Sequence, residues 1–189
     1  LEAVERKVKV FVLSSAEARL KDRIEEETDF IKANYIQLID KKFKNHFVHR
    51  TAENFHAKYI LIDPKTNPKG FICTNNFTEN GFSKNSELAV ELNKEQCEEF
   101  FKVFVYHFWE HSTDEQTATT DFEKVKPANK FSLSKLNNLL LTSPNSELNT
   151  LNEALKNAVR NGKKSISLST FQLDKNTELI KTILEKAKQ

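Results

Sequence analysis

The sequence contains no methionine, has only two cysteines and lacks any apolar run long enough to cross a membrane. A transmembrane helix needs roughly 18 or more consecutive apolar residues, and a signal peptide needs an apolar stretch near its start, so we expect neither. Cys73 and Cys97 do not have the spacing of a metal site, and they are too few for a disulfide framework. A cytoplasmic location is therefore the default expectation.

The sequence also lacks a strong excess of either charge, with 29 basic and 27 acidic residues. This balance does not indicate a nucleic-acid-binding protein, although a local basic groove can lie on a nearly neutral surface. The hydrophobic content of 38% and the charged content of 30% predict a globular chain. The chain begins inside a predicted helix and ends in an amphipathic run, 179–189, so we expect it to be part of a longer polypeptide.

Strands and helices are predicted to alternate along the chain. Alternating or continuous apolar residues predict strands at 7–13, 55–62, 70–74, 87–92, 131–133 and 164–171. Apolar residues at helical spacing predict helices at 1–6, 16–38, 94–111, 146–160 and 177–188. The polar, threonine-rich residues 112–130 are typical of a linker. This order predicts an α/β fold in which helices pack on a sheet.

The strand predicted at 55–62 carries an unusual pair of polar residues. Side chains alternate between the faces of a strand, so His56 and Lys58 share one face. Burying an ammonium group beside an imidazole without an anion is costly. A bound phosphodiester would resolve this conflict, because Lys58 could neutralise a non-bridging oxygen while His56 attacks phosphorus in line. The alternative is a structural histidine beside a lysine that reaches solvent, but it leaves the neighbouring Asn and Glu residues unexplained.

The spacing His56-x-Lys58-x4-Asp63 resembles the motif of the phospholipase D superfamily. About ten residues later the family has Gly-Ser-x-Asn, and here Cys-Thr-Asn-Asn stands at 73–76, with Cys in the place of Gly. The Asn-x-Glu of the family appears at 85–87, followed by an apolar run that resembles the family's next strand.

The resemblance implies a role for each matching residue. His56 would be the nucleophile or the proton donor, and the phosphate ligands would be Lys58, Thr74 and Asn76. Glu87 would complete the catalytic set by orienting the histidine of an opposite half of the site. Asp63 would have a structural role at the end of the strand. The resemblance also implies a reaction that needs no metal and no cofactor.

The same resemblance implies a phospholipase D-like αβα sandwich, in which helices flank a mixed sheet. Residues 1–112 would form a first repeat that lacks its opening strand and helix, and 147–189 would begin a second repeat. Residues 113–146 would connect the two. Because the chain has one His-x-Lys motif, the second half of the site would come from a missing part of the chain or from a homodimer.

Three other features allow an alternative interpretation. His46, His49 and His56 could suggest a metal site, but no carboxylate or cysteine lies at ligand spacing. The basic and aromatic residues of 41–50, namely Lys41, Lys42, Phe43, Lys44, Phe47 and Arg50, could follow a nucleic-acid backbone or form a solvated edge over core aromatics. The phenylalanine-rich helix at 100–109 is more typical of a core than of a lipid-binding surface.

The function that these residues favour is a phosphodiesterase that acts through a phosphohistidine intermediate. The basic, aromatic residues 41–50 and the lack of a membrane element favour a nuclease acting on DNA or RNA. A phospholipase D or phosphatidyltransferase is the alternative within the same chemistry. An inactive nucleic-acid-binding or assembly module is the alternative from another class.

Overall fold

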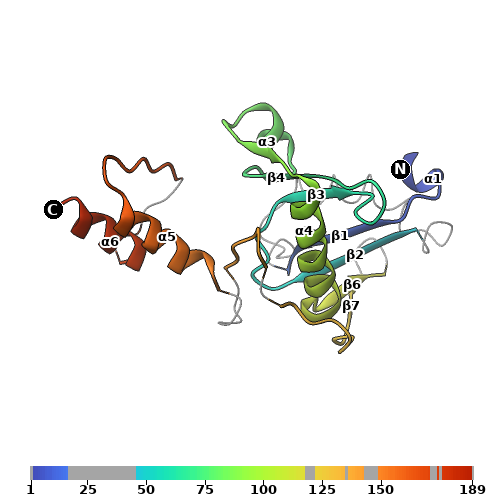
Figure 1. Ribbon diagram of the computed structural model, residues 1–189. Helices are drawn as coiled ribbons and strands as arrows, with labels where there is room; N and C mark the ends of the chain where they lie inside the picture. The colour runs from blue at the N-terminus through green and yellow to red at the C-terminus, as the bar shows by residue number, and fades with distance from the viewer. Residues whose placement is uncertain are drawn as a thin grey trace. The chain divides into compact units, whose positions relative to one another are not determined.

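The computed structural model describes residues 2–16, 46–117, 122–134, 136–142, 149–170, 174 and 176–188. The chain forms two compact units, Leu1–Leu133 and Ser134–Gln189 (Figure 1). Nearly all of the helix predicted at 16–38, and the basic residues Lys41, Lys42 and Lys44, lie outside the described part.

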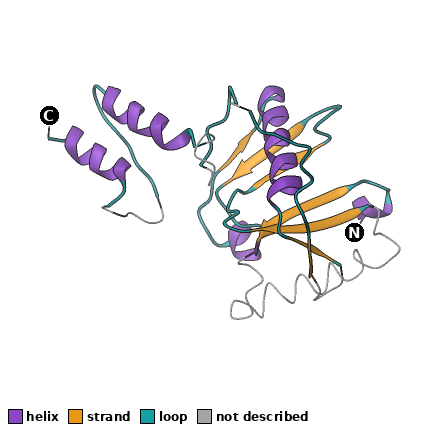
Figure 2. Ribbon diagram, turned by 90° about the horizontal axis from the view of Figure 1, so that it is seen from below, coloured by secondary structure: helices purple, strands orange, loops and turns teal. Residues whose placement is uncertain are grey.

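The first unit contains two sheets, visible as two groups of arrows in Figure 2. One sheet has the order β1-β2-β6-β7 and consists of Val10–Ser15, Phe47–Ala52, Asp114–Gln116 and Phe122–Lys124. In it β1 and β2 are parallel, and the other pairs are antiparallel. The second sheet is antiparallel, has the order β3-β4-β5 and consists of Tyr59–Ile62, Lys69–Cys73 and Ala89–Glu91. The mixed α/β class is confirmed, with the strands divided between two sheets.

A long helix, α4 (Lys94–Tyr106), contacts β3 and β4 and continues as a π-helical segment, His107–His111, which contacts β2 (Figure 1). Asn93 caps its first turn in a capping box with Gln96, as Asn does where backbone N–H groups lack partners. At its far end Phe108 is fully buried and contacts the ring of Phe11 on β1, with ring centroids 5.6 Å apart. The helix predicted at 94–111 is confirmed, and its phenylalanines serve the core.

Gly70 allows α4 to pack directly on β4. A Cβ atom at this position would lie 2.9 Å from Leu61 Cδ2, 3.0 Å from Cys97 Sγ and 3.1 Å from Leu92 Cδ1. Interiors are packed so tightly that one added methyl group must displace a neighbour. Cys97 is fully buried here, and burial raises the pKa of its thiol, which is the state of an inert core cysteine.

The stretch predicted as a linker instead contains β6 and β7. Thr51 and Arg50 of β2 pair with Asp114 and Glu115 of β6. This pairing satisfies backbone groups that β2 would otherwise leave open. The strand predicted at 131–133 is also wrong. The backbone N–H groups of this region donate to the Glu110 carboxylate, with distances of 2.8, 3.0 and 2.9 Å from Asn129, Lys130 and Phe131.

Sequence reasoning assigned no strand to residues 41–50, yet β2 begins at Phe47 and is buried along most of its length. The polar residues of β2 interrupt the alternation that would predict a strand. His49 and Arg50 are both buried, so the alternation of apolar and polar residues that indicates a strand is absent.

The described residues of the second unit form two helices that contact each other, α5 (Leu151–Asn161) and α6 (Glu178–Lys186). The helix predicted from 146 begins at Leu151, and residues 143–148 lie outside the described part. The strand predicted at 164–171 is wrong over 165–170, where the chain forms neither helix nor strand. A strand requires a neighbour to pair with, and the described residues of this unit offer none.

The assignment of 147–189 to a second repeat stays a prediction. None of the helices among the described residues combines the length and the apolar character that crossing a bilayer requires.

Candidate active site

His56 and Lys58 are brought into contact immediately before β3. The Lys58 Nζ atom lies 2.8 Å from His56 Nδ1 and 2.9 Å from His56 Nε2. The strand predicted from Phe55 begins only at Tyr59. However, the Lys58 carbonyl accepts a hydrogen bond of 2.8 Å from the Cys73 backbone. Lys58 therefore still lies in register with β4, and the two side chains reach the same side of the chain, as the alternation predicts.

The residues that precede and follow this pair, Phe55 and Tyr59, anchor the segment on the opposite side. The Tyr59 ring lies 5.0 Å from the Phe100 ring of α4, and the Phe55 ring lies 5.7 Å from the His107 ring. Burial, reinforced by the neighbouring His111, lowers the pKa of His107 to about 4. His107 is therefore neutral at pH 7 and packs against Phe55, the residue that precedes His56. The sequence predicts that His107 lies in a core helix, and it gives no indication of the contact with Phe55.

The Lys58 ammonium group is the main charge of the site. Burial lowers its pKa from the ordinary value, and the negative charge of Glu87 opposes that shift by raising it. Lys58 donates hydrogen bonds and cannot accept them when charged, and which ring nitrogen of His56 accepts depends on the tautomer of the imidazole. A ring nitrogen with a free lone pair is what a nucleophile needs.

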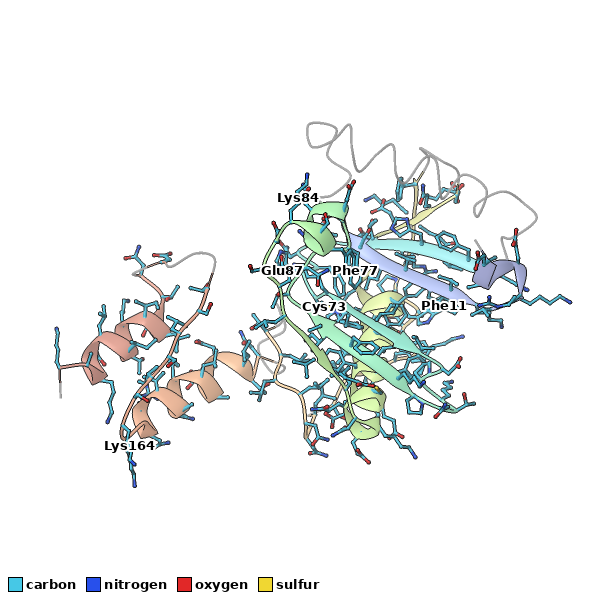
Figure 3. All side chains as sticks on the ribbon, turned by 90° about the horizontal axis from the view of Figure 1, so that it is seen from above. Phe11, Cys73, Phe77, Lys84, Glu87 and Lys164 are labelled. Carbon is cyan, nitrogen blue, oxygen red and sulfur yellow. The ribbon has the colours of Figure 1, made fainter. Side chains whose placement is uncertain are left out.

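Glu87 is held in place by the connection between β4 and β5. Thr74 Oγ1 donates to Glu87 Oε2 at 2.5 Å, and Asn85 Nδ2 donates to Glu87 Oε1 at 3.3 Å. Thr74 Oγ1 in turn accepts from the Leu88 backbone at 3.0 Å. Both carboxylate oxygens are thus engaged at the end of β4, near Cys73 (Figure 3). Thr74, predicted as a phosphate ligand, orients Glu87 in this structure.

Asn76 is exposed on the turn that follows β4, and its backbone is packed tightly. Its carbonyl accepts from the Thr78 backbone at 2.8 Å and from Asn75 Nδ2 at 3.3 Å. A Cβ atom on Gly81 would lie only 2.2 Å from the same carbonyl oxygen. Only glycine fits there, although sequence reasoning did not identify Gly81. The Asn-Gly pair at 80–81 was the available signal.

The hydrogen bonds of the described residues connect the predicted site in two separate pairs. One pair is His56 with Lys58, and the other is Thr74 with Glu87. Glu87 links the pairs through its charge, which acts on Lys58. The described hydrogen bonds do not include the side-chain amide of Asn76.

Asp63 lies at the end of β3 in a left-handed backbone conformation, with a φ of 46°. Its carbonyl accepts from the Thr66 and Asn67 backbones at 3.0 and 3.2 Å, which closes the turn toward β4. Asp tolerates this conformation better than most residues do. The placement is compatible with a structural role in the turn, and that role stays a prediction.

His49 was one of three histidines that could suggest a metal site. His49 is buried, with Nε2 2.8 Å from Ser14 Oγ and Nδ1 2.7 Å from Gln116 Oε1, so both ring nitrogens are occupied. Within the described ranges, no group of three or more His, Cys, Asp or Glu residues could hold a metal ion.

Arg50 was a candidate for contact with a nucleic-acid backbone, but it is buried. Its guanidinium group contacts the Glu115 carboxylate through Nε and NH2, both at 2.9 Å, and lies 4.4 Å from the centre of the Trp109 ring. Phe47 is buried as well. Phe47 is therefore a core aromatic, as the second interpretation of 41–50 expected, whereas the burial of Arg50 fits neither a solvated edge nor a contact with nucleic acid.

Comparison with known families identifies the site-bearing unit. Residues 1–111 match the family model described as cardiolipin synthase, PLD-like domain. The chain belongs to this phospholipase D-like family. The match covers more than half of the chain and includes every predicted site residue from His56 to Glu87. Membership of the phospholipase D superfamily is confirmed, and it supports a phosphodiesterase function in general. No curated protein and no solved structure matches the chain significantly.

Proposed function

We propose that this chain supplies one half of a metal-independent phosphodiesterase site, with His56 as the nucleophile. The observation that carries the proposal is the contact between Lys58 Nζ and the His56 ring at 2.8 Å, next to the negative charge of Glu87. An imidazole beside an ammonium group is suited to receive a phosphodiester and attack it.

The reaction has two steps. A ring nitrogen of His56 forms a bond to phosphorus, the bond from phosphorus to the leaving oxygen breaks, and a second histidine donates a proton to that oxygen. Water then attacks phosphorus and gives a proton to the same second histidine. The phosphorus–nitrogen bond breaks and restores His56. The second histidine would come from another copy of the chain or from a further part of a longer one.

Lys58 changes its partner during this cycle. Its ammonium group contacts the imidazole in this structure, and a bound phosphate would draw it to a non-bridging oxygen. That movement frees the lone pair of His56 for attack. Glu87, oriented by Thr74, keeps Lys58 charged while burial favours the neutral amine.

A nucleic acid is the substrate that we favour, because lysines at 41, 42 and 44 precede the site in the sequence. A phospholipid is the second candidate, because the matching family is described as cardiolipin synthase. Both substrates present a phosphodiester to the same residues.

The test is incubation of the intact gene product that contains this chain with single-stranded DNA, duplex DNA and phosphatidylcholine, each with and without EDTA. We expect cleavage of single-stranded DNA that EDTA does not reduce, and a trapped phosphohistidine that His56→Ala lacks. His46→Ala is the matched control and should retain activity. Unchanged turnover in His56→Ala would refute the proposal, and retained binding without any turnover in the unaltered protein would favour the binding module.

A further inference from the structure

The connection between β4 and β5 carries two stacked aromatic rings on its surface. Phe77 is 50% exposed and Phe82 is 69% exposed, and their ring centroids lie 5.9 Å apart at an interplanar angle of 10°. Among the aromatic pairs of the described residues, this is the one in which both rings are exposed. Exposed apolar groups gathered beside a site are typical of a binding surface.

The two rings are attached to the turn that presents Asn76. Phe77 follows Asn76 directly, and Phe82 follows Gly81, which packs against the Asn76 carbonyl. Thr78 Oγ1 accepts from the Gly81 backbone at 3.2 Å and caps the short helix α3 (Glu79–Ser83). The stack and the predicted phosphate ligand therefore belong to one tightly packed turn, and Figure 3 shows Phe77 of this turn with Glu87.

We infer that Phe77 and Phe82 stack a nucleobase of the substrate, next to the phosphate that His56 attacks. The inference rests on the proposed function and names its substrate class more closely. Aromatic rings bind bases of single strands through their π-faces without regard to sequence. A base inside a duplex has both faces covered by its neighbours, so the stack favours a single strand.

The charges around the stack favour a nucleobase over a bilayer surface. Glu79 and Lys84 flank the rings with opposite charges, and Glu87 adds a second carboxylate nearby. Inserting the rings into the apolar part of a bilayer would take these charged groups out of water, which is costly. A single base needs only the ring faces.

The experiment measures binding of the chain to a short labelled oligodeoxythymidylate and to an abasic strand of equal length and charge. We expect the strand with bases to bind about 10-fold more tightly. Phe82→Leu keeps apolar bulk but removes the ring, and it should abolish that preference, whereas Phe82→Tyr should retain it. Phe131→Leu changes a phenylalanine that is 43% exposed outside this turn and is the matched control.

Thermal unfolding of each variant shows whether the turn remains folded, and Phe77→Leu is the second variant if Phe82→Leu unfolds. An unchanged preference in both Leu variants would overturn the inference. A second result would also overturn it. In that result the unaltered protein shows no preference between the two strands, and both it and the Phe82→Leu variant bind phosphatidylglycerol vesicles. If the abasic strand is cleaved as fast as the normal one and cleavage still requires His56, the stacking inference fails while the proposed function stands.

Discussion

The two sheets of the first unit differ in the exposure of their functional polar side chains. In the sheet β1-β2-β6-β7, His49 is buried, and both of its ring nitrogens are engaged, one by Ser14 and the other by Gln116. At the end of the sheet β3-β4-β5, His56 and Asn76 are exposed, and Lys58 and Glu87 are only half-buried. A buried polar group must find partners to offset its desolvation, whereas an exposed cluster remains able to bind a ligand. The comparison separates the histidine of the core from the histidine of the site.

The largest expected effect is the difference in stability between alanine variants of the two histidines, His49 and His56. His49→Ala should lower the free energy of unfolding by about 3 kcal/mol, because it leaves a cavity and removes the shared partner of Ser14 and Gln116. His56→Ala should change stability by less than about 0.5 kcal/mol and should abolish turnover. Urea unfolding and an activity assay on both variants check this. Equal stabilities would show that the two sheets do not differ in this way.

The next effect concerns the turn that presents Asn76. Gly81→Ala should push the Asn76 backbone away, because the added Cβ would overlap its carbonyl oxygen at 2.2 Å. Overpacking of this kind costs about 1–3 kcal/mol, and we expect a loss of about 10-fold in affinity for a phosphodiester analogue. Gly162→Ala, where the nearest atom would lie at 3.3 Å, is the control. Isothermal titration of both variants measures the difference.

A smaller effect concerns the pKa of Lys58 in the exposed cluster. Burial lowers the pKa of Lys58, and the charge of Glu87 raises it, so Glu87→Gln should lower this pKa further. Binding of a phosphodiester requires the ammonium form and should therefore be lost at a lower pH in the variant than in the unaltered protein. A pH series of binding measurements between neutral pH and about 10, the ordinary range of lysine, checks the shift.

The same pKa has the opposite consequence for stability. Because the folded value lies below the unfolded value of 10.5, the unfolded state binds more protons between the two values, and stability rises with pH there. A stability that falls across that window while binding persists would contradict the assigned shift of Lys58.

The smallest effect tests the buried side of the site-bearing sheet. The Tyr59 hydroxyl is buried without a hydrogen-bond partner among the described residues, and burial raises its pKa. Tyr59→Phe removes this unsatisfied group and keeps the ring that packs on Phe100. We expect stability to rise by up to about 1 kcal/mol, without change in activity. Thermal unfolding measures the gain, and a marked loss of stability would reveal a partner for the hydroxyl.

Much of the site-bearing sheet could be predicted from the sequence, because local alternation determines it. The common side of His56 and Lys58 and the inward packing of Phe55 and Tyr59 both follow from a period of two. Gly81 and His107 escaped prediction, because their importance depends on residues that approach them only after folding.

The strands that were missed or wrongly placed share a different cause. Residues 165–170 have the alternation of a strand, yet no strand forms there among the described residues. By contrast, 114–116 is polar and still forms β6, because β2 presents an open edge to it. A strand forms when a neighbouring strand pairs with its backbone N–H and C=O groups. The local sequence pattern does not show whether such a neighbour is present.

The amino-acid sequence by itself determined the family, the helical and extended character of most segments, and which side of the chain carries the imidazole and the ammonium group. The tertiary structure decided which distant groups meet. It placed Thr74 against Glu87, stacked Phe77 on Phe82 and enclosed His49. The reason is physical: backbone geometry repeats within a few residues, whereas hydrogen bonds and ring contacts between distant residues form only when packing brings them together.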